Sequence, residues 1–154
     1  MTILIAKRGN ISGPNPSREN TWTYIQEALD AGYYVECDLW VCDNQFFLGH
    51  DEPQEKIDIT QLENPCLFLH AKDIVTMHKL SEMFYFSDYS PDVFFHQNDD
   101  LALTKKGLLW TFPGKTLTPT SIAVLPENVI HWFNLENAAG ICSDYIERYK
   151  NGKV

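Results

Sequence analysis

The fold is decided by residues 33–40, whose sequence is YYVECDLW. Aromatic and β-branched residues dominate this stretch and predict a strand, with residues 45–48 returning as a hairpin partner. Side chains alternate along a strand, so Glu36 and Asp38 share one face and Cys37 points to the other. Two carboxylates side by side on an apolar strand favour a hard divalent cation such as Mg²⁺ or Ca²⁺.

The chain has 154 residues, which predicts a single domain over residues 1–154 with a substantial core. No apolar run approaches the length of a membrane span, and the apolar start of the chain is too short for a signal peptide. We therefore expect a cytoplasmic protein. The net charge of −9 argues against broad contact with nucleic acid or anionic lipid, because both require a basic face.

Strands and helices alternate in the first half of the chain. Residues 2–6 predict a short apolar strand, and residues 17–31 an amphipathic helix that begins at a serine and ends before Gly32. A second pair follows, with a strand over residues 65–71 and a helix over residues 73–84 whose apolar residues share one side.

The second half of the chain has a different pattern, in which short apolar strands leave room for few helices. Strands are expected at residues 93–95, 108–112, 122–125, 129–132 and 140–142, with a last helix at residues 144–150. The alternating first half predicts parallel strands with right-handed crossovers. If such a sheet closes into a barrel, it must omit several outer helices, because eight complete units need about 250 residues. The uncovered strands would then favour a homo-oligomer.

The four cysteines form neither a CxxC pair nor a zinc-binding spacing. They are Cys37, Cys42, Cys66 and Cys142. Because most of them lie in apolar, strand-like stretches, we expect buried free thiols with no catalytic role.

A series of short motifs resembles the glycerophosphodiester phosphodiesterase family in order and spacing over the first third of the chain. That family has His-Arg-Gly after its first strand, Glu-Asn-Thr at a helix start, Glu-x-Asp on its second strand and His-Asp after a hairpin. The corresponding residues here are Lys7-Arg8-Gly9, Glu19-Asn20-Thr21, Glu36-Cys37-Asp38 and His50-Asp51. Two later segments also look like the family's third and closing strands, namely His70-Ala71-Lys72 and Ser143-Asp144.

The resemblance implies an α/β fold, a compact TIM-like barrel that lacks several outer helices, with its site at the carboxyl ends of the strands. It also implies a divalent metal ion, Mg²⁺ or Ca²⁺, bound by Glu36, Asp38 and His70. The histidine stands where the family has an acidic ligand, and an imidazole shifts the preference toward Mn²⁺ or Zn²⁺.

The resemblance assigns the remaining site residues to phosphate binding and proton transfer. Arg8 and Lys72 would hold phosphate oxygens, and Glu19 would orient the loop after the first strand. His50 would act as acid or base together with Lys7, which replaces the family's first catalytic histidine. A lysine acts as a base near neutral pH only if its pKa is lowered.

Other interpretations of these residues are also open. Trp40 continues the alternation from Glu36 and Asp38, so it is a candidate for lining the pocket. The two carboxylates could instead form buried ion pairs with Arg8 and Lys72. The polar cluster at residues 96–100 follows a predicted strand, and we interpret it as a turn.

The sequence thus predicts a metal-dependent hydrolase of a small glycerophosphodiester-like substrate, as in lipid metabolism. One alternative is a pseudoenzyme that binds a phosphate-containing ligand or a metal without turnover. Another is a lyase that releases a cyclic phosphate.

Overall fold

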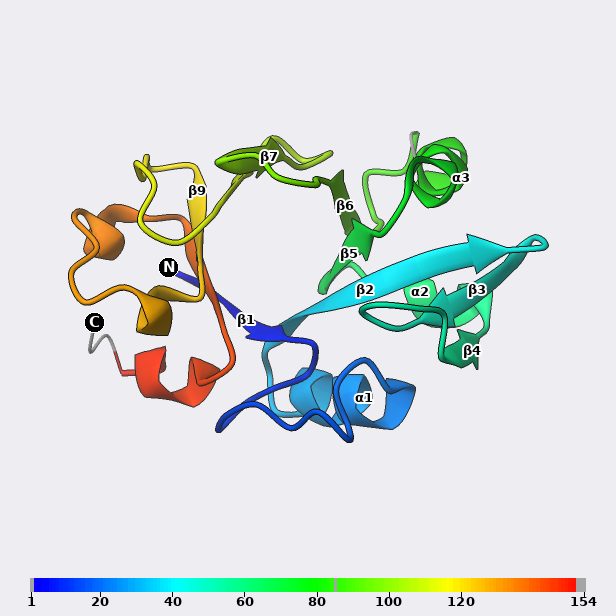
Figure 1. Ribbon diagram of the computed structural model, residues 1–154, viewed down its shortest axis with the longest axis horizontal. Helices are drawn as coiled ribbons and strands as arrows, with labels where there is room; N and C mark the ends of the chain where they lie inside the picture. The colour runs from blue at the N-terminus through cyan, green and yellow to red at the C-terminus, as the bar shows by residue number, and fades with distance from the viewer. Residues whose placement is uncertain (1, 85, 152–154) are drawn as a thin grey trace.

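The computed structural model describes residues 2–84 and 86–151, which form a curled, mixed β-sheet in the shape of a half-barrel (Figure 1). Seven neighbouring strands are parallel, in the order β6-β5-β2-β1-β10-β9-β8. Their bounds are β1 Ile3–Lys7, β2 Tyr34–Cys42, β5 Leu67–Ala71, β6 Asp92–Phe95, β8 Leu109–Thr111, β9 Ser121–Val124 and β10 Gly140–Ser143. The carboxyl ends of these strands meet at one edge of the sheet.

Three further strands are antiparallel to their neighbours. They are β3 Gln45–Leu48, β4 Glu55–Ile57 and β7 Leu101–Leu103. The long strand β2 pairs with β1 and β5 along its first part and continues as the hairpin with β3, which in turn pairs with β4. At the other end of the sheet, β7 pairs with β8, and no β-ladder joins β7 to β6 within the described ranges.

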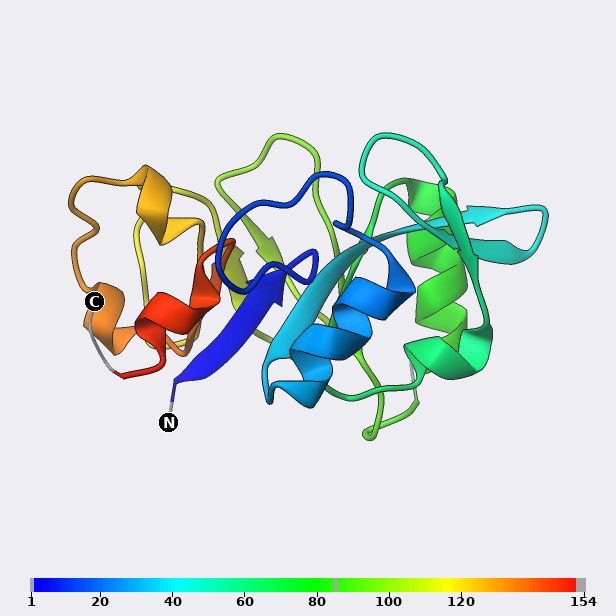
Figure 2. The same ribbon diagram turned by 90° about the horizontal axis from the view of Figure 1, so that it is seen from below.

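The helices lie on the convex side of the sheet. Those of the described residues are α1 Trp22–Asp30, α2 Ile59–Leu62 and α3 Ile74–Phe84, with 3₁₀ turns η1 Pro126–Asn128, η2 Leu135–Asn137 and η3 Ile146–Tyr149. Helix α1 packs against β2, and α3 packs against β2, β5 and β6 (Figure 2). None of the described helices has the length and apolar character that a membrane span requires.

The expected TIM-like barrel is wrong, because the sheet is mixed and helices do not alternate with its strands. The connections of the second half are too short for covering helices, and 3₁₀ turns replace them. Residues 129–132, expected as a strand, are irregular, and the last expected helix is η3. The first helix starts later than expected, since its N-cap is Thr21.

Side-chain alternation separates two cores. The outer core joins the helices to the residues of β2 and β5 that point outward, such as Val35, Leu39 and Leu69. The inner core fills the concave side, with Ile5, Phe68 and further apolar residues of β6, β8, β9 and β10. On β1 and β5 the inner face is apolar near the amino end, where Ile5 and Phe68 lie, and carries Lys7 and His70 at the carboxyl end.

The four thiols divide into two pairs by burial. Cys37 lies in the outer core and Cys142 in the inner core, whereas Cys42 and Cys66 are half-buried. Burial, followed by the nearby Glu36 carboxylate, raises the pKa of both fully buried thiols well above its usual value. The thiolate is the reactive form. Burial keeps reagents away from these two thiols, and the raised pKa keeps them protonated.

We therefore predict that only Cys42 and Cys66 react with a thiol reagent in the native protein, and that all four react after unfolding. Absorbance after addition of Ellman's reagent, with and without denaturant, measures the number of reactive thiols. A Cys42→Ser/Cys66→Ser protein is the control and should show no native reaction. Rapid native labelling of that protein would contradict the two-core arrangement.

Candidate functional site

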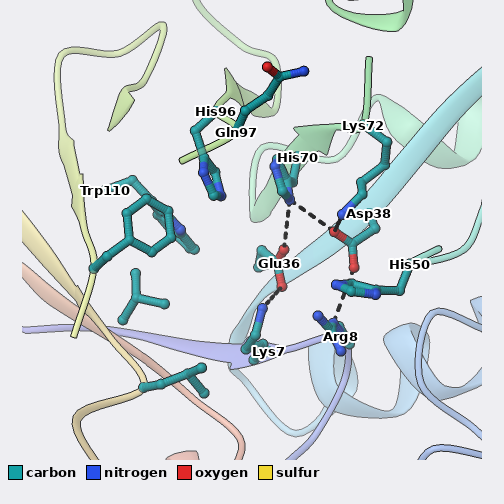
Figure 3. Close-up of a pocket in the computed structure, with 13 residues that line it drawn as sticks. Lys7, Arg8, Glu36, Asp38, His50, His70, Lys72, His96, Gln97 and Trp110 are labelled. Carbon is teal, nitrogen blue, oxygen red and sulfur yellow. Dashed lines mark hydrogen bonds and ion pairs between the residues drawn. The ribbon is translucent and has the colours of Figure 1, made fainter. Parts of the chain in front are cut away.

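A pocket of about 360 Å³ opens at the carboxyl ends of the parallel strands (Figure 3). It is lined by every residue that the sequence predicted for the site except Glu19 and Trp40. Lys7 ends β1, Glu36 and Asp38 lie on β2, and His70 lies on β5, with Lys72 just beyond it. The strand register places Lys7 beside Glu36 and Asp38 beside His70.

The carboxylate of Asp38 is buried, with hydrogen bonds to three side chains and an ion pair with Arg8. Its Oδ1 lies 2.9 Å from His70 Nδ1 and 3.1 Å from Lys72 Nζ. Its Oδ2 lies 2.9 Å from Asn20 Nδ2 and 3.1 Å from Arg8 Nε. Burial opposes ionisation, but the His70 hydrogen bond and the nearby lysines outweigh it and hold the pKa of Asp38 well below its usual value.

Asn20 connects the loop before α1 to the second strand. In addition to its bond to the carboxylate, its Oδ1 accepts the backbone N–H of Asp38 at 2.9 Å. Both Asn20 and Arg8 have left-handed backbone, with φ of 55° and 52°, and the Asn20 N–H donates to the Arg8 carbonyl. Asparagine tolerates this conformation better than most residues do, which explains why an asparagine occupies the middle position of the Glu-Asn-Thr motif.

Glu36 is as buried as Asp38 but has fewer partners. Its Oε2 lies 3.5 Å from Lys7 Nζ, and its Oε1 lies 3.9 Å from His70 Nδ1. Burial lowers the pKa of Lys7, but the Glu36 carboxylate and further groups outweigh that effect, so the pKa is raised. A raised pKa keeps Lys7 charged at neutral pH, where it can neutralise an anion.

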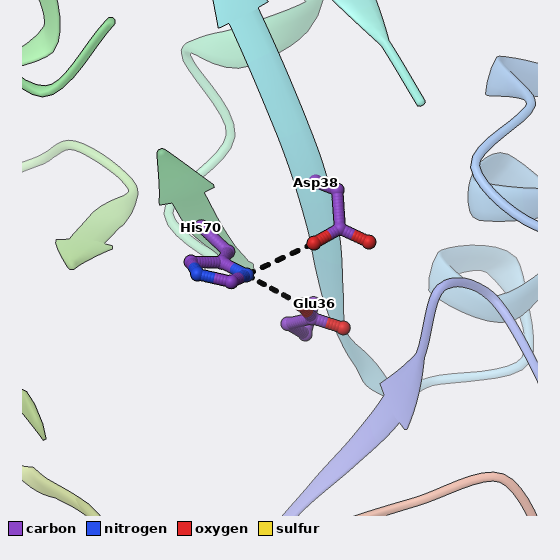
Figure 4. A group of neighbouring side chains, drawn as sticks. All are labelled: Glu36, Asp38 and His70. Atoms are coloured by element: carbon purple, nitrogen blue, oxygen red, sulfur yellow. Dashed lines mark hydrogen bonds and ion pairs between the residues drawn. The ribbon is translucent and has the colours of Figure 1, made fainter. Parts of the chain in front are cut away.

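The three residues predicted as metal ligands are brought together (Figure 4). One ligand atom from each of Glu36, Asp38 and His70 lies within 4.8 Å of the others. Two carboxylates and an imidazole are a chemically suitable donor set, and the weakly partnered Glu36 carboxylate favours a cation. However, Lys72 already lies beside the same Asp38 oxygen, and His70 Nδ1 must be unprotonated before it can bind a metal.

His50 reaches the rim of the pocket from the loop between β3 and β4. Its Nδ1 lies 2.7 Å from Asp51 Oδ1, and its side chain is partly exposed. The structure places Trp40 outside the pocket lining, where its indole Nε1 donates to the Gly49 carbonyl at 2.7 Å. The indole thus holds the loop that carries His50.

Glu19 lies behind Arg8, outside the pocket lining. Its carboxylate pairs with Arg8 Nη1 at 3.3 Å and accepts from Asn10 Nδ2 at 2.9 Å and from the Asn15 backbone N–H at 3.1 Å. The Asn10 amide also donates to Asp144 Oδ1, which ties this loop to the end of β10. This position suits the predicted orienting role of Glu19.

Two polar residues of the pocket were missed, because the polar cluster after β6 was interpreted as a turn. His96 and Gln97 line the pocket, and the His96 ring stacks on the His70 ring with centroids 4.7 Å apart. Burial, followed by the positive charge of nearby side chains, lowers the pKa of His96 to about 4, so its ring is neutral at neutral pH. The available signal was a histidine directly after an apolar strand.

The charged side chains that line the pocket carry a net positive charge, since Lys7, Arg8 and Lys72 face only Glu36 and Asp38. This excess of cations favours an anionic ligand.

No protein-family model, curated protein or solved structure matches this chain. The resemblance to glycerophosphodiester phosphodiesterases therefore rests on the quoted motifs, and membership of that family stays a prediction.

We predict that Asn20→Ala lowers the free energy of unfolding by about 3 kcal/mol, because it removes two buried hydrogen bonds and strains a left-handed residue. Asn20→Gly loses the same bonds without the strain and should cost about 1 kcal/mol less. Urea unfolding followed by circular dichroism measures both values. A loss below about 1 kcal/mol in Asn20→Ala would show that the Asp38 contacts add little to stability.

Proposed function

We propose that this protein binds a small phosphodiester at the carboxyl ends of its parallel strands and hydrolyses it with the help of a divalent cation. The observation that carries the proposal is the convergence, in one pocket, of three cations, two buried carboxylates and a partly exposed histidine. Separately each feature has a structural explanation, but together they supply phosphate binding, charge neutralisation and proton transfer.

The side chains of the pocket suggest distinct roles. Arg8 pairs with Asp38 through Nε and with Glu19 through Nη1, so Nη2 is the group that can donate to a phosphate oxygen. Lys7 and Lys72 supply further positive charge. His50, oriented by Asp51, can give a proton to the leaving alkoxide as its bond to phosphorus breaks. A divalent cation bound by Glu36, Asp38 and His70 would add charge stabilisation at the phosphoryl oxygens.

A binding protein without turnover is the second candidate. It is favoured because three hydrogen bonds and the Arg8 ion pair already compensate Asp38, and Lys7 already faces Glu36. Such a protein would bind phosphate compounds and leave them intact.

Metal binding is predicted to compete with Lys72. Its ammonium lies 3.1 Å from the Asp38 oxygen that a metal would use, so Lys72→Met should tighten Mn²⁺ binding about tenfold. Asp38→Asn should weaken binding at least as strongly. Isothermal titration calorimetry on the chelator-treated protein measures both affinities.

The matched control for this change is Lys56→Met, which removes an exposed lysine on β4 and should leave the affinity unchanged. Equal affinities for the native protein and Lys72→Met would show that any bound metal lies away from Asp38.

Hydrolysis is predicted to depend on the same cluster. With a panel of small diesters, including glycerophosphocholine, turnover should require Mg²⁺, Ca²⁺ or Mn²⁺ and stop with a chelator. Glu36→Gln should lower kcat at least about 100-fold, and His50→Asn by about 10²–10⁴, while His78→Asn, at an exposed histidine on α3, should have no effect. Phosphorus NMR follows substrate and product together.

The same spectra separate the rival functions. Binding of phosphate compounds without any product would replace the hydrolase by a binding protein. A cyclic phosphate that accumulates and persists would identify a lyase.

A further inference from the structure

The pocket has a second half that the proposed chemistry does not use. The charged residues gather on β1, β2 and β5, whereas the opposite wall comes from β8, β9 and the residues after them. This apolar wall consists of Trp110, Phe112, Val124 and Leu125. An apolar surface does not stabilise a phosphate group. If the ligand contacts this wall, it does so through another, apolar part.

Aromatic rings connect the two halves. The rings of Phe94, His70 and His96 are parallel to within 6°, with His70 4.9 Å from Phe94 and 4.7 Å from His96. The Phe112 ring also contacts His96, with centroids 4.1 Å apart, but it is tilted by 47° from that ring. Figure 3 shows His96 between His70 and Trp110, with its ring directed into the pocket.

The wall is rigid where it joins the core. Phe94 is fully buried and stacks on Trp110 with centroids 4.5 Å apart, and Val124 is also buried. Leu125 has left-handed backbone with φ of 50°, held by the bond from its N–H to the Cys142 carbonyl. A preformed surface of this kind binds without an ordering cost for its side chains.

We propose that the apolar wall is a subsite for a flat aromatic group esterified to the phosphate that the cations hold. This inference rests on the proposed phosphate-binding role and names the substrate class as aryl or heteroaryl phosphate esters. The Trp110 and Phe112 rings that line this wall, with the His96 ring beside Phe112, favour contact with a planar aromatic group. Gln97, at the exposed rim, offers an amide to a ring heteroatom.

Binding of three phosphate monoesters tests the subsite without requiring turnover. The probes are methyl phosphate, cyclohexyl phosphate and phenyl phosphate, which share the anion and differ in the size and flatness of the organic group. We expect phenyl phosphate to bind about tenfold more tightly than methyl phosphate and several-fold more tightly than cyclohexyl phosphate. Isothermal titration calorimetry measures all three affinities on the native protein.

Variants at Phe112 locate the effect. Phe112→Leu keeps most of the packing volume and should reduce the preference for phenyl over cyclohexyl phosphate to about twofold or less, with the affinity for methyl phosphate unchanged. Phe133→Ala is the control, since this exposed ring does not line the pocket and should leave every affinity unchanged.

The outcomes separate this inference from the function on which it rests. If all three phosphates bind with equal affinity, or if the preference survives in Phe112→Leu, the aromatic subsite is excluded while phosphate binding stands. If no phosphate binds at all, both the subsite and the phosphate-binding role of the cations on which it rests are excluded.

Discussion

The buried carboxylate of Asp38 is the interaction on which the site depends. An ionised group with 1 % exposure is unfavourable unless its charge is compensated, and here three hydrogen bonds and the ion pair with Arg8 do so. Arg8 comes from the end of β1, Asn20 from the loop before α1, and His70 and Lys72 from the end of β5. The contacts of this one carboxylate therefore position three segments of the chain relative to β2.

The curl of the sheet makes this concentration of charge tolerable. On β1 and β5 the inner face is apolar toward the amino end, with Ile5 and Phe68 in the inner core, and polar or charged at the carboxyl end, whereas β8 and β9 stay apolar up to the pocket. The charges consequently lie at the open end of the half-barrel, where ligand and solvent can reach them, and the apolar layer beneath excludes water. A flat sheet would separate β1, β5 and β8 too far for one pocket to touch all three.

The first half of the fold and most of the site could be predicted, because they depend on local patterns. Alternation on residues 33–40 places Glu36 and Asp38 inward, and the motif spacing brings Arg8 and His50 to the same edge. The second half depends on pairings between distant short strands, which carry no periodic signal. Residues 129–132 illustrate this, since they are as apolar as a strand but pair with none of the strands in the described part of the chain.

His96 was missed because its own segment has the composition of a turn. Its place in the pocket depends on neighbours from β5 and β8, which are distant in the sequence. Trp40 was assigned to the pocket by alternation along β2, but beyond Leu39 this strand pairs with β3 and no longer with β5. There its indole meets the Gly49 carbonyl and leaves the pocket. Local alternation is reliable only where a strand keeps the same neighbours.

The charge balance of the site gives Lys7 a consistent role. The protein carries a net charge of −9, so anions are repelled from most of its surface. Within the pocket the cations outnumber the carboxylates, and Lys7 is what creates the excess, since Arg8 and Lys72 alone would only balance Glu36 and Asp38. A neutral histidine at position 7 would leave anion attraction to a bound metal. With lysine at position 7, the side chains of the pocket attract the anion by themselves. A bound metal ion would strengthen this preference for anions.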